Sequence, residues 1–229
     1  MKIRTLCIVA MILLMPSISL ASDIKDNAKS NSVELLLNIV KNCQRTQDNK
    51  EILKEKPENI YKSNNLRHYQ NIETEAAGVK IALIGHVLDN HCHPVRNAVV
   101  EIWQVDSYGK SQKYCESVKA PLAREEPDAE YTSMFKECDR FFTGSGTSIT
   151  DEKGMYVFFT IMPAIIHKTP HIDMSINSKE LGTLNTRNLL TNPLNIDEIP
   201  ASLLNKLEGS TAIYRFDIVF PIENRYNRY

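Results

Sequence analysis

Short stretches of alternating apolar and polar side chains, separated by turn residues, constrain the fold of this chain more than any other feature. Residues 79–87, 98–104 and 156–161 each predict a strand. In residues 212–220 one face carries four apolar side chains: Tyr214, Phe216, Ile218 and Phe220. The opposite face includes Arg215 and Asp217, so we expect it to be only partly buried. Together these strands predict an all-β sandwich.

Length and composition are those of one moderate domain. The chain has 229 residues, of which 42% are hydrophobic and 24% charged, which is enough for a single sizeable core. The 27 basic and 28 acidic side chains leave a formal net charge of -1. This balance argues against nucleic acid or an anionic membrane surface as a partner. The sequence also contains no glycine-rich phosphate loop and no internal repeat.

Residues 1–21 have the pattern of a secretory signal peptide. Lys2 and Arg4 supply a basic start, and an apolar run over residues 6–15 is too short to span a bilayer. Small residues stand at the two positions that signal peptidase reads, Ser19 and Ala21. We therefore expect cleavage after Ala21 and a periplasmic or secreted mature protein. No later segment approaches the roughly 20 apolar residues that a membrane helix needs.

Between the signal and the sandwich, residues 22–77 predict a helical extension and a linker. Residues 32–44 repeat apolar side chains at helical spacing behind Ser32, a suitable N-cap. Residues 48–65 are polar and contain Pro57, which is typical of a linker or a short irregular helix. The sandwich domain is then predicted over residues 78–229. Within it, residues 189–207 contain two prolines and should form a loop and a short helix.

Four cysteines remain after removal of the predicted signal, which contains Cys7. An even number in an exported chain favours disulfides, and four cysteines permit three pairings. We favour Cys115 with Cys138, because closing the charged insertion between them removes unfolded-state entropy worth about 3 kcal/mol. Cys43 with Cys92 then follows by elimination, and would tie the N-terminal helix to the sandwich.

Several separated motifs, in a fixed order, resemble the intradiol ring-cleavage dioxygenase family. Residues 87–89 and 94–106 resemble its first core strands, and residues 142–146 with 150–163 resemble its central hairpin. Residues 170–174, Pro-His-Ile-Asp-Met, stand where the family has a Pro-Ala-His-Ile-His ligand strand. The resemblance implies an intradiol-dioxygenase-like β-sandwich, here with a short N-terminal helical extension.

The resemblance also implies where iron ligands would lie. The family holds ferric iron with two tyrosinates and two histidines, and its His-x-His pair lies on one strand, so that both histidines share a face. Here the first histidine is His171, and the second has become Asp173. The position of the first tyrosine falls on Ser111, between Tyr108 and Tyr114, and the loop of the second tyrosine contains none.

A candidate metal site remains, formed by His171, Asp173 and His167 of that loop. Two histidines and one carboxylate suit ferrous iron, or a zinc ion that retains a water. Ferric iron instead favours anionic oxygen donors, and both phenolates are missing at the aligned positions. The alternative interpretation, which we favour, is that His171 is a remnant packed or hydrogen-bonded inside the sandwich.

Other conspicuous residues have structural explanations. His91, Cys92 and His93 suggest a metal clip, but they lie in a predicted turn between two strands. Trp103 and Tyr156 lie inside alternating strands, so we predict that they pack in the core.

The leading hypothesis is an exported, disulfide-linked sandwich that no longer cleaves rings and acts as a binding or structural module of the cell envelope. It requires no cofactor, and its partner is an envelope protein or a small aromatic ligand. The alternative is an iron-dependent ring-cleavage dioxygenase that acts on a catechol-like aromatic through a site rebuilt from His167, His171 and Asp173.

Overall fold

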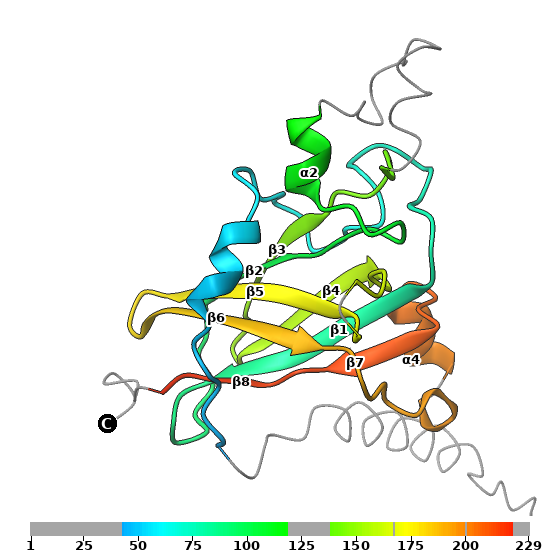
Figure 1. Cartoon of the computed structure of the whole chain (residues 1–229). Helices are drawn as coiled ribbons and strands as arrows, with labels where there is room; N and C mark the ends of the chain where they lie inside the picture. The colour runs from blue at the N-terminus through cyan, green and yellow to red at the C-terminus, as the bar shows by residue number, and fades with distance from the viewer. Residues whose placement is uncertain (1–42, 119–137, 167, 200, 222–229) are drawn as a thin grey trace, which may run out of the picture. The chain divides into compact units, whose positions relative to one another are not determined.

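The structure, a computed structural model, describes residues 43–118, 138–166, 168–199 and 201–221 (Figure 1). The predicted signal peptide and most of the predicted helix over residues 32–44 lie outside these ranges. The short helices are η1 (Lys50–Glu55), α2 (Gln112–Ser117), η2 (Ile196–Glu198) and α4 (Ala201–Lys206). Two of our expectations are thereby confirmed, the short helix within residues 48–65 and the loop with a short helix within residues 189–207. Among the described residues, no helix has the length and apolar character needed to cross a membrane.

The strands form two four-stranded sheets, which Figure 1 shows as two layers. In the first sheet, β1 (Lys80–Leu88) lies between β4 (Met155–Ile161) and β7 (Ala212–Arg215), and its end also pairs with β8 (Ile218–Val219). The second sheet has the order β3 (Ser145–Ile149), β2 (Val99–Trp103), β5 (His171–Ser178) and β6 (Gly182–Leu189). The predicted all-β sandwich is confirmed.

The hydrophobic core lies between the two sheets. Its cluster of buried side chains draws on both, including Ile81 and Leu83 of β1, Phe158 of β4, Ile102 of β2 and Met174 of β5. Because successive residues of a strand point to opposite faces, the odd-numbered side chains of β2 and β5 point away from this core. The outer face of the second sheet therefore presents the strand positions that the family uses for metal ligands.

The prediction that residues 142–163 form a hairpin is wrong, because its two strands belong to different sheets. β3 pairs with β2 in the second sheet, whereas β4 pairs with β1 in the first. The turn between them is tight, and the Gly154 N–H donates to the Asp151 carbonyl at 2.9 Å. Gly154 has a φ of 73°, a left-handed conformation that favours glycine. The turn therefore carries the chain from one sheet to the other instead of closing a hairpin.

The predicted single strand over residues 212–220 is also wrong, because it is interrupted at Phe216 and Asp217 to give β7 and β8. The Asp217 carboxylate accepts a hydrogen bond from the His86 backbone N–H at 2.9 Å, so a side chain takes the place of a backbone partner. The Phe216 carbonyl approaches Gly85 of β1 so closely that a Cβ there would lie 1.9 Å from it. Our expectation that the face with Arg215 is only partly buried is confirmed.

Residues 44–49, which we term the strap, connect the edges of the two sheets. The Thr46 N–H donates to the Val219 carbonyl of β8 at 2.9 Å, and the Asn49 N–H donates to the Asn185 carbonyl of β6 at 2.7 Å. A disulfide joins Cys43, directly before the strap, to Cys92 in the turn after β1. The strap is thus held at its start by a covalent bond and along its length by both sheets.

Candidate functional site

The outer face of the second sheet is the candidate site, because it carries His171 and Asp173 on β5. η1 lies against β6 on this face, and α2 is tied to the segment around η1. The Lys113 ammonium of α2 donates to the Lys54 carbonyl, and the Gln112 amide donates to the Asn59 carbonyl at 2.8 Å. The N-terminal segment and α2 are therefore joined beside the site.

Asp173 is held by a guanidinium. β5 and β6 pair so that Asp173 stands directly opposite Arg187. Arg187 Nε donates to Oδ1 at 2.6 Å and Nη2 donates to Oδ2 at 2.9 Å, which makes the pair bidentate. The Asp173 side chain is only 5% exposed and that of Arg187 is 34% exposed. The hydrogen bonds to Asp173 raise the pKa of Arg187 against the opposing effect of burial.

A second ion pair lies on the same face. Trp103 is the neighbour of Asp173 across β2 and β5, and Glu101 lies two residues earlier on β2. Lys56 Nζ is 2.6 Å from a Glu101 carboxylate oxygen and 5.6 Å from the centroid of the Trp103 ring. Trp103 is buried, as predicted, but on the outer face under this lysine instead of between the sheets. Two ion pairs, Arg187 with Asp173 and Lys56 with Glu101, therefore lie beside the Trp103 ring.

The histidines of the predicted site are only partly placed. His171 and Asp173 share one face of β5, as expected, and His171 Nδ1 lies 3.4 Å from the Thr169 carbonyl oxygen. His167 lies outside the described residues. Within the described ranges, no three His, Cys, Asp or Glu side chains are grouped so that they could hold a metal ion. The three-residue site therefore stays a prediction.

The position that aligns with the family's first tyrosine is occupied by Ser111, which has a structural role. Ser111, at the position of the family's first tyrosine, is the N-cap of α2 and accepts a hydrogen bond from the Tyr114 N–H at 3.1 Å. The neighbouring rings are exposed, 57% for Tyr108 and 45% for Tyr114. Lys110 Nζ lies 4.9 Å from the centroid of the Tyr114 ring.

These residues do not fit ferric iron bound as the family binds it. The described donors are one histidine and one carboxylate, and both carboxylate oxygens already accept hydrogen bonds from a guanidinium. Neither aligned tyrosine is present, so no phenolate offsets the charge of the ion.

The rival metal clip is excluded by its cysteine. Cys92 forms the disulfide with Cys43, with the two Cα atoms 5.5 Å apart, so no thiolate is present there. His93 Nδ1 lies 3.2 Å from an Asp89 carboxylate oxygen.

The second disulfide joins Cys115 to Cys138, with Cα atoms 6.1 Å apart, so the predicted pairing is confirmed.

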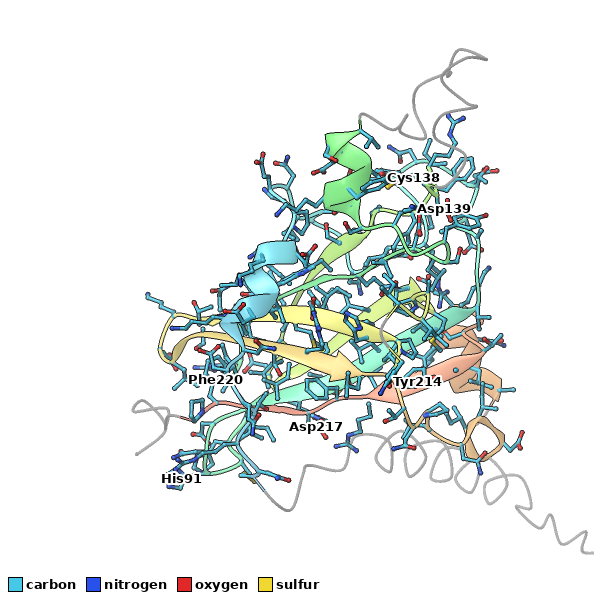
Figure 2. All side chains as sticks on the ribbon, in the orientation of Figure 1. His91, Cys138, Asp139, Tyr214, Asp217 and Phe220 are labelled. Carbon is cyan, nitrogen blue, oxygen red and sulfur yellow. A yellow bond between two sulfur atoms is a disulfide. The ribbon has the colours of Figure 1, made fainter. Side chains whose placement is uncertain are left out.

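A partly buried charge cluster at the break between β7 and β8 was not predicted from the sequence. Asp217, labelled in Figure 2, accepts from the His86 ring at 3.1 Å and from Arg215 Nε at 2.8 Å. Burial alone raises the pKa of Asp217, but the hydrogen bond from His86 and the charge of Arg215 outweigh it, so that the pKa is lowered. This carboxylate is therefore ionised in the folded protein.

Comparison with known proteins identifies the family. A family model described as dioxygenase matches residues 58–176. The chain belongs to the intradiol ring-cleavage dioxygenase family. It is 32% identical over 165 residues to a protein of Rickettsia felis, a match that covers 69% of this chain and 73% of the relative. A protein of Rickettsia bellii is 34% identical over 116 residues, which is 50% of this chain and 51% of that relative, or about half its length. Both relatives carry a provisional dioxygenase name.

A solved structure also aligns with most of this chain. The intradiol ring-cleavage dioxygenase from Tetranychus urticae aligns with a TM-score of 0.48 and 19% sequence identity. The alignment covers 81% of this chain and 98% of that structure.

Proposed function

We propose that this chain is an exported member of the intradiol dioxygenase family that has lost ring cleavage and acts as a binding or structural module of the cell envelope. The observation that carries the proposal is the bidentate pair of Arg187 with Asp173 at the position of the family's second histidine ligand. A metal ion would have to share this carboxylate with the guanidinium, whose positive charge opposes a second cation.

The charge balance around Trp103 supports the same conclusion. Each carboxylate of this part of the face has its own protein cation, Arg187 for Asp173 and Lys56 for Glu101. In the family, two phenolates offset part of the charge of ferric iron. Here the charges of Asp173 and Glu101 are offset by Arg187 and Lys56, so this part of the outer face needs no metal ion to be electrically neutral.

Export is supported by the signal-like start and by the two disulfides. Disulfides persist in oxidising compartments and are rare in the cytosol of mesophiles. Both cysteine pairs lie in surface connections of the sandwich, where they link segments that are distant in sequence, by 49 and 23 residues. The proposed partner is an envelope protein or a small aromatic ligand.

The test is the metal content and the activity of the purified mature protein. We expect no stoichiometric iron by elemental analysis, no visible absorption of the kind that tyrosinate gives ferric iron, and no oxygen uptake with catechol or protocatechuate. An intradiol dioxygenase with intact ligands, assayed in parallel, is the positive control. Stoichiometric iron or ring cleavage would contradict the proposal and favour the rebuilt site of His167, His171 and Asp173.

If iron is found, matched histidine variants locate it. His171→Ala should then remove the iron, whereas His91→Ala and His93→Ala should retain it, because only His171 shares a strand face with a candidate ligand. Loss of the iron in His91→Ala and His93→Ala, with iron retained in His171→Ala, would place the ion in the turn after β1.

A further inference from the structure

A cavity of about 480 Å³ lies between the strap and the edges of the two sheets. Its walls come from the strap, from Thr186 and Arg187 of β6, and from the connection of β7 to β8 at Phe216 and Asp217. A volume of this size is typical of sites for small molecules. The cavity reaches Arg187 but includes neither His171 nor Asp173 in its lining, so it is distinct from the family's metal position.

The charged groups of the lining favour an anion. Arg45 of the strap is exposed, and among the described residues no carboxylate pairs with it. Arg187 directs Nε and Nη2 to Asp173, which leaves Nη1 without a hydrogen bond in the described part of the chain. The carboxylate in the lining, Asp217, is already bound by His86 and Arg215. Two guanidinium groups therefore have donors available, whereas the acceptor is occupied.

The lining also offers an apolar surface. Phe216 is half-buried, packs against the hydrophobic core and faces the cavity. Val219 of β8 lines the same wall. Most ligand sites combine apolar walls with a few polar groups that fix orientation, and an aromatic ring supplies such a wall with a flat face.

We propose that this cavity binds a small organic carboxylate, whose carboxylate group is held by Arg45 and the Nη1 edge of Arg187 and whose apolar body lies against Phe216. The inference rests on the proposed binding role and specifies its ligand class. Guanidinium groups match carboxylates through paired, charge-assisted hydrogen bonds, which supply both affinity and orientation.

The disulfide fixes one wall of this site. Cys43 immediately precedes the strap, and its bond to Cys92 keeps Arg45 close to β8. The Thr46 hydroxyl, which accepts from the Val219 N–H at 2.9 Å, adds a second anchor. A wall fixed in advance lowers the entropy lost on binding.

The experiment is calorimetric titration of the mature protein with benzoate at low ionic strength, with benzamide as the uncharged probe of similar shape. We expect saturable binding of one benzoate per chain and none of benzamide. Arg45→Gln should weaken benzoate binding about tenfold, equivalent to about 1.4 kcal/mol, because it removes a charge-assisted hydrogen bond to the carboxylate. Arg45 is exposed, so this variant should fold.

The matched control is Arg96→Gln, which removes an arginine that is also exposed, pairs with Glu152 and does not line the cavity. Its benzoate affinity should equal that of the unaltered protein. The inference is overturned if benzoate does not saturate, if benzamide binds equally well, or if Arg45→Gln has no more effect than Arg96→Gln. Iron content is measured on the same sample, so that an iron-loaded protein would contradict the proposed loss of ring cleavage without affecting the benzoate result.

Discussion

Asp173 and Arg187 face each other across β5 and β6, and the guanidinium holds both oxygens of the carboxylate. The family's ligand strand is therefore retained as a strand but used for an ion pair. The positive charge of the guanidinium offsets that of the carboxylate, which weakens the attraction of Asp173 for a metal ion. The same arginine also lines the cavity beneath the strap, so it connects the outer face of the second sheet to the proposed ligand site.

The first prediction concerns the stability of this pair. Arg187→Ala should lower the free energy of unfolding by about 2 kcal/mol, because it leaves the buried Asp173 carboxylate without a counter-charge. The effect should fall below that of a fully buried pair, since a third of the arginine side chain is in solvent. Urea denaturation followed by circular dichroism measures it.

Two further variants separate the pair from a general effect of removing arginine. The double variant Asp173→Asn with Arg187→Gln should be more stable than Arg187→Ala, since no unpaired charge is left buried. Arg96→Ala removes an exposed partner of Glu152 and should change stability by less than about 0.5 kcal/mol. Equal losses in Arg187→Ala and Arg96→Ala would show that the pair has no special role.

The second prediction concerns export and redox state. The mature chain should begin at Ser22, and its intact mass should be four hydrogens below that of the fully reduced form, because both disulfides are formed. N-terminal sequencing and mass spectrometry of protein from the exported fraction measure both. Four free thiols, or a chain that retains Met1 to Ala21, would contradict it.

The third prediction concerns acid stability. The pKa of Asp217 is lowered in the folded state, so its contribution to the free energy of unfolding is present above its unfolded pKa, about 4. The contribution is lost as the pH falls through the lower, folded pKa. Asp217→Asn should therefore be less stable at pH about 7 and should lose stability less steeply below pH about 4.

Denaturation curves across this pH range measure the effect. Glu152→Gln, which alters an exposed carboxylate, should keep the acid dependence of the unaltered protein. Identical acid dependence in Asp217→Asn and the unaltered protein would contradict the assignment of this carboxylate.

Part of the fold could be predicted because it depends on local pattern. The alternation of residues 79–87 and 156–161 is observed as β1 and β4, since one face of each must meet the core. The observed cysteine pairing is the one favoured from the charged insertion between Cys115 and Cys138, although an even count of four permits three pairings. The family motifs in turn placed His171 and Asp173 on one face of a strand, as observed.

Arg187 could not be found in the same way. β6 has few apolar residues, and its side chains Asn185, Thr186 and Asn188 are buried although polar. The glycine at position 182 indicates a hairpin turn. In a hairpin that pairs Ser178 with Gly182, residue 187 lies opposite residue 173. Pairing the two strands by register would have brought the arginine to Asp173.

Arg67 shows a second limit of sequence reasoning. It is fully buried, and its guanidinium donates to the carbonyl oxygens of Thr160, Glu208 and Ile81 and to the Ser210 hydroxyl. These acceptors come from three distant segments of the chain. No local pattern distinguishes such an arginine from one on a solvated surface, because its partners are defined only by the fold.

The last prediction concerns the close approach of β1 to the connection of β7 and β8. In Gly85→Ala the new Cβ would lie 1.9 Å from the Phe216 carbonyl oxygen and 2.9 Å from the Tyr156 hydroxyl. That hydroxyl donates to the same carbonyl at 2.5 Å, so the contact has no room to relax without losing a hydrogen bond. The variant should lose about 3 kcal/mol of stability, at the upper end of overpacking effects.

Gly182→Ala is the control, because no atom lies within 4 Å of its Cβ position and only its positive φ of 85° opposes the change. It should lose about 1 kcal/mol. A loss for Gly85→Ala no larger than for Gly182→Ala in urea denaturation would mean that β1 and the Phe216 carbonyl can separate freely, and that the break between β7 and β8 is not held by this contact.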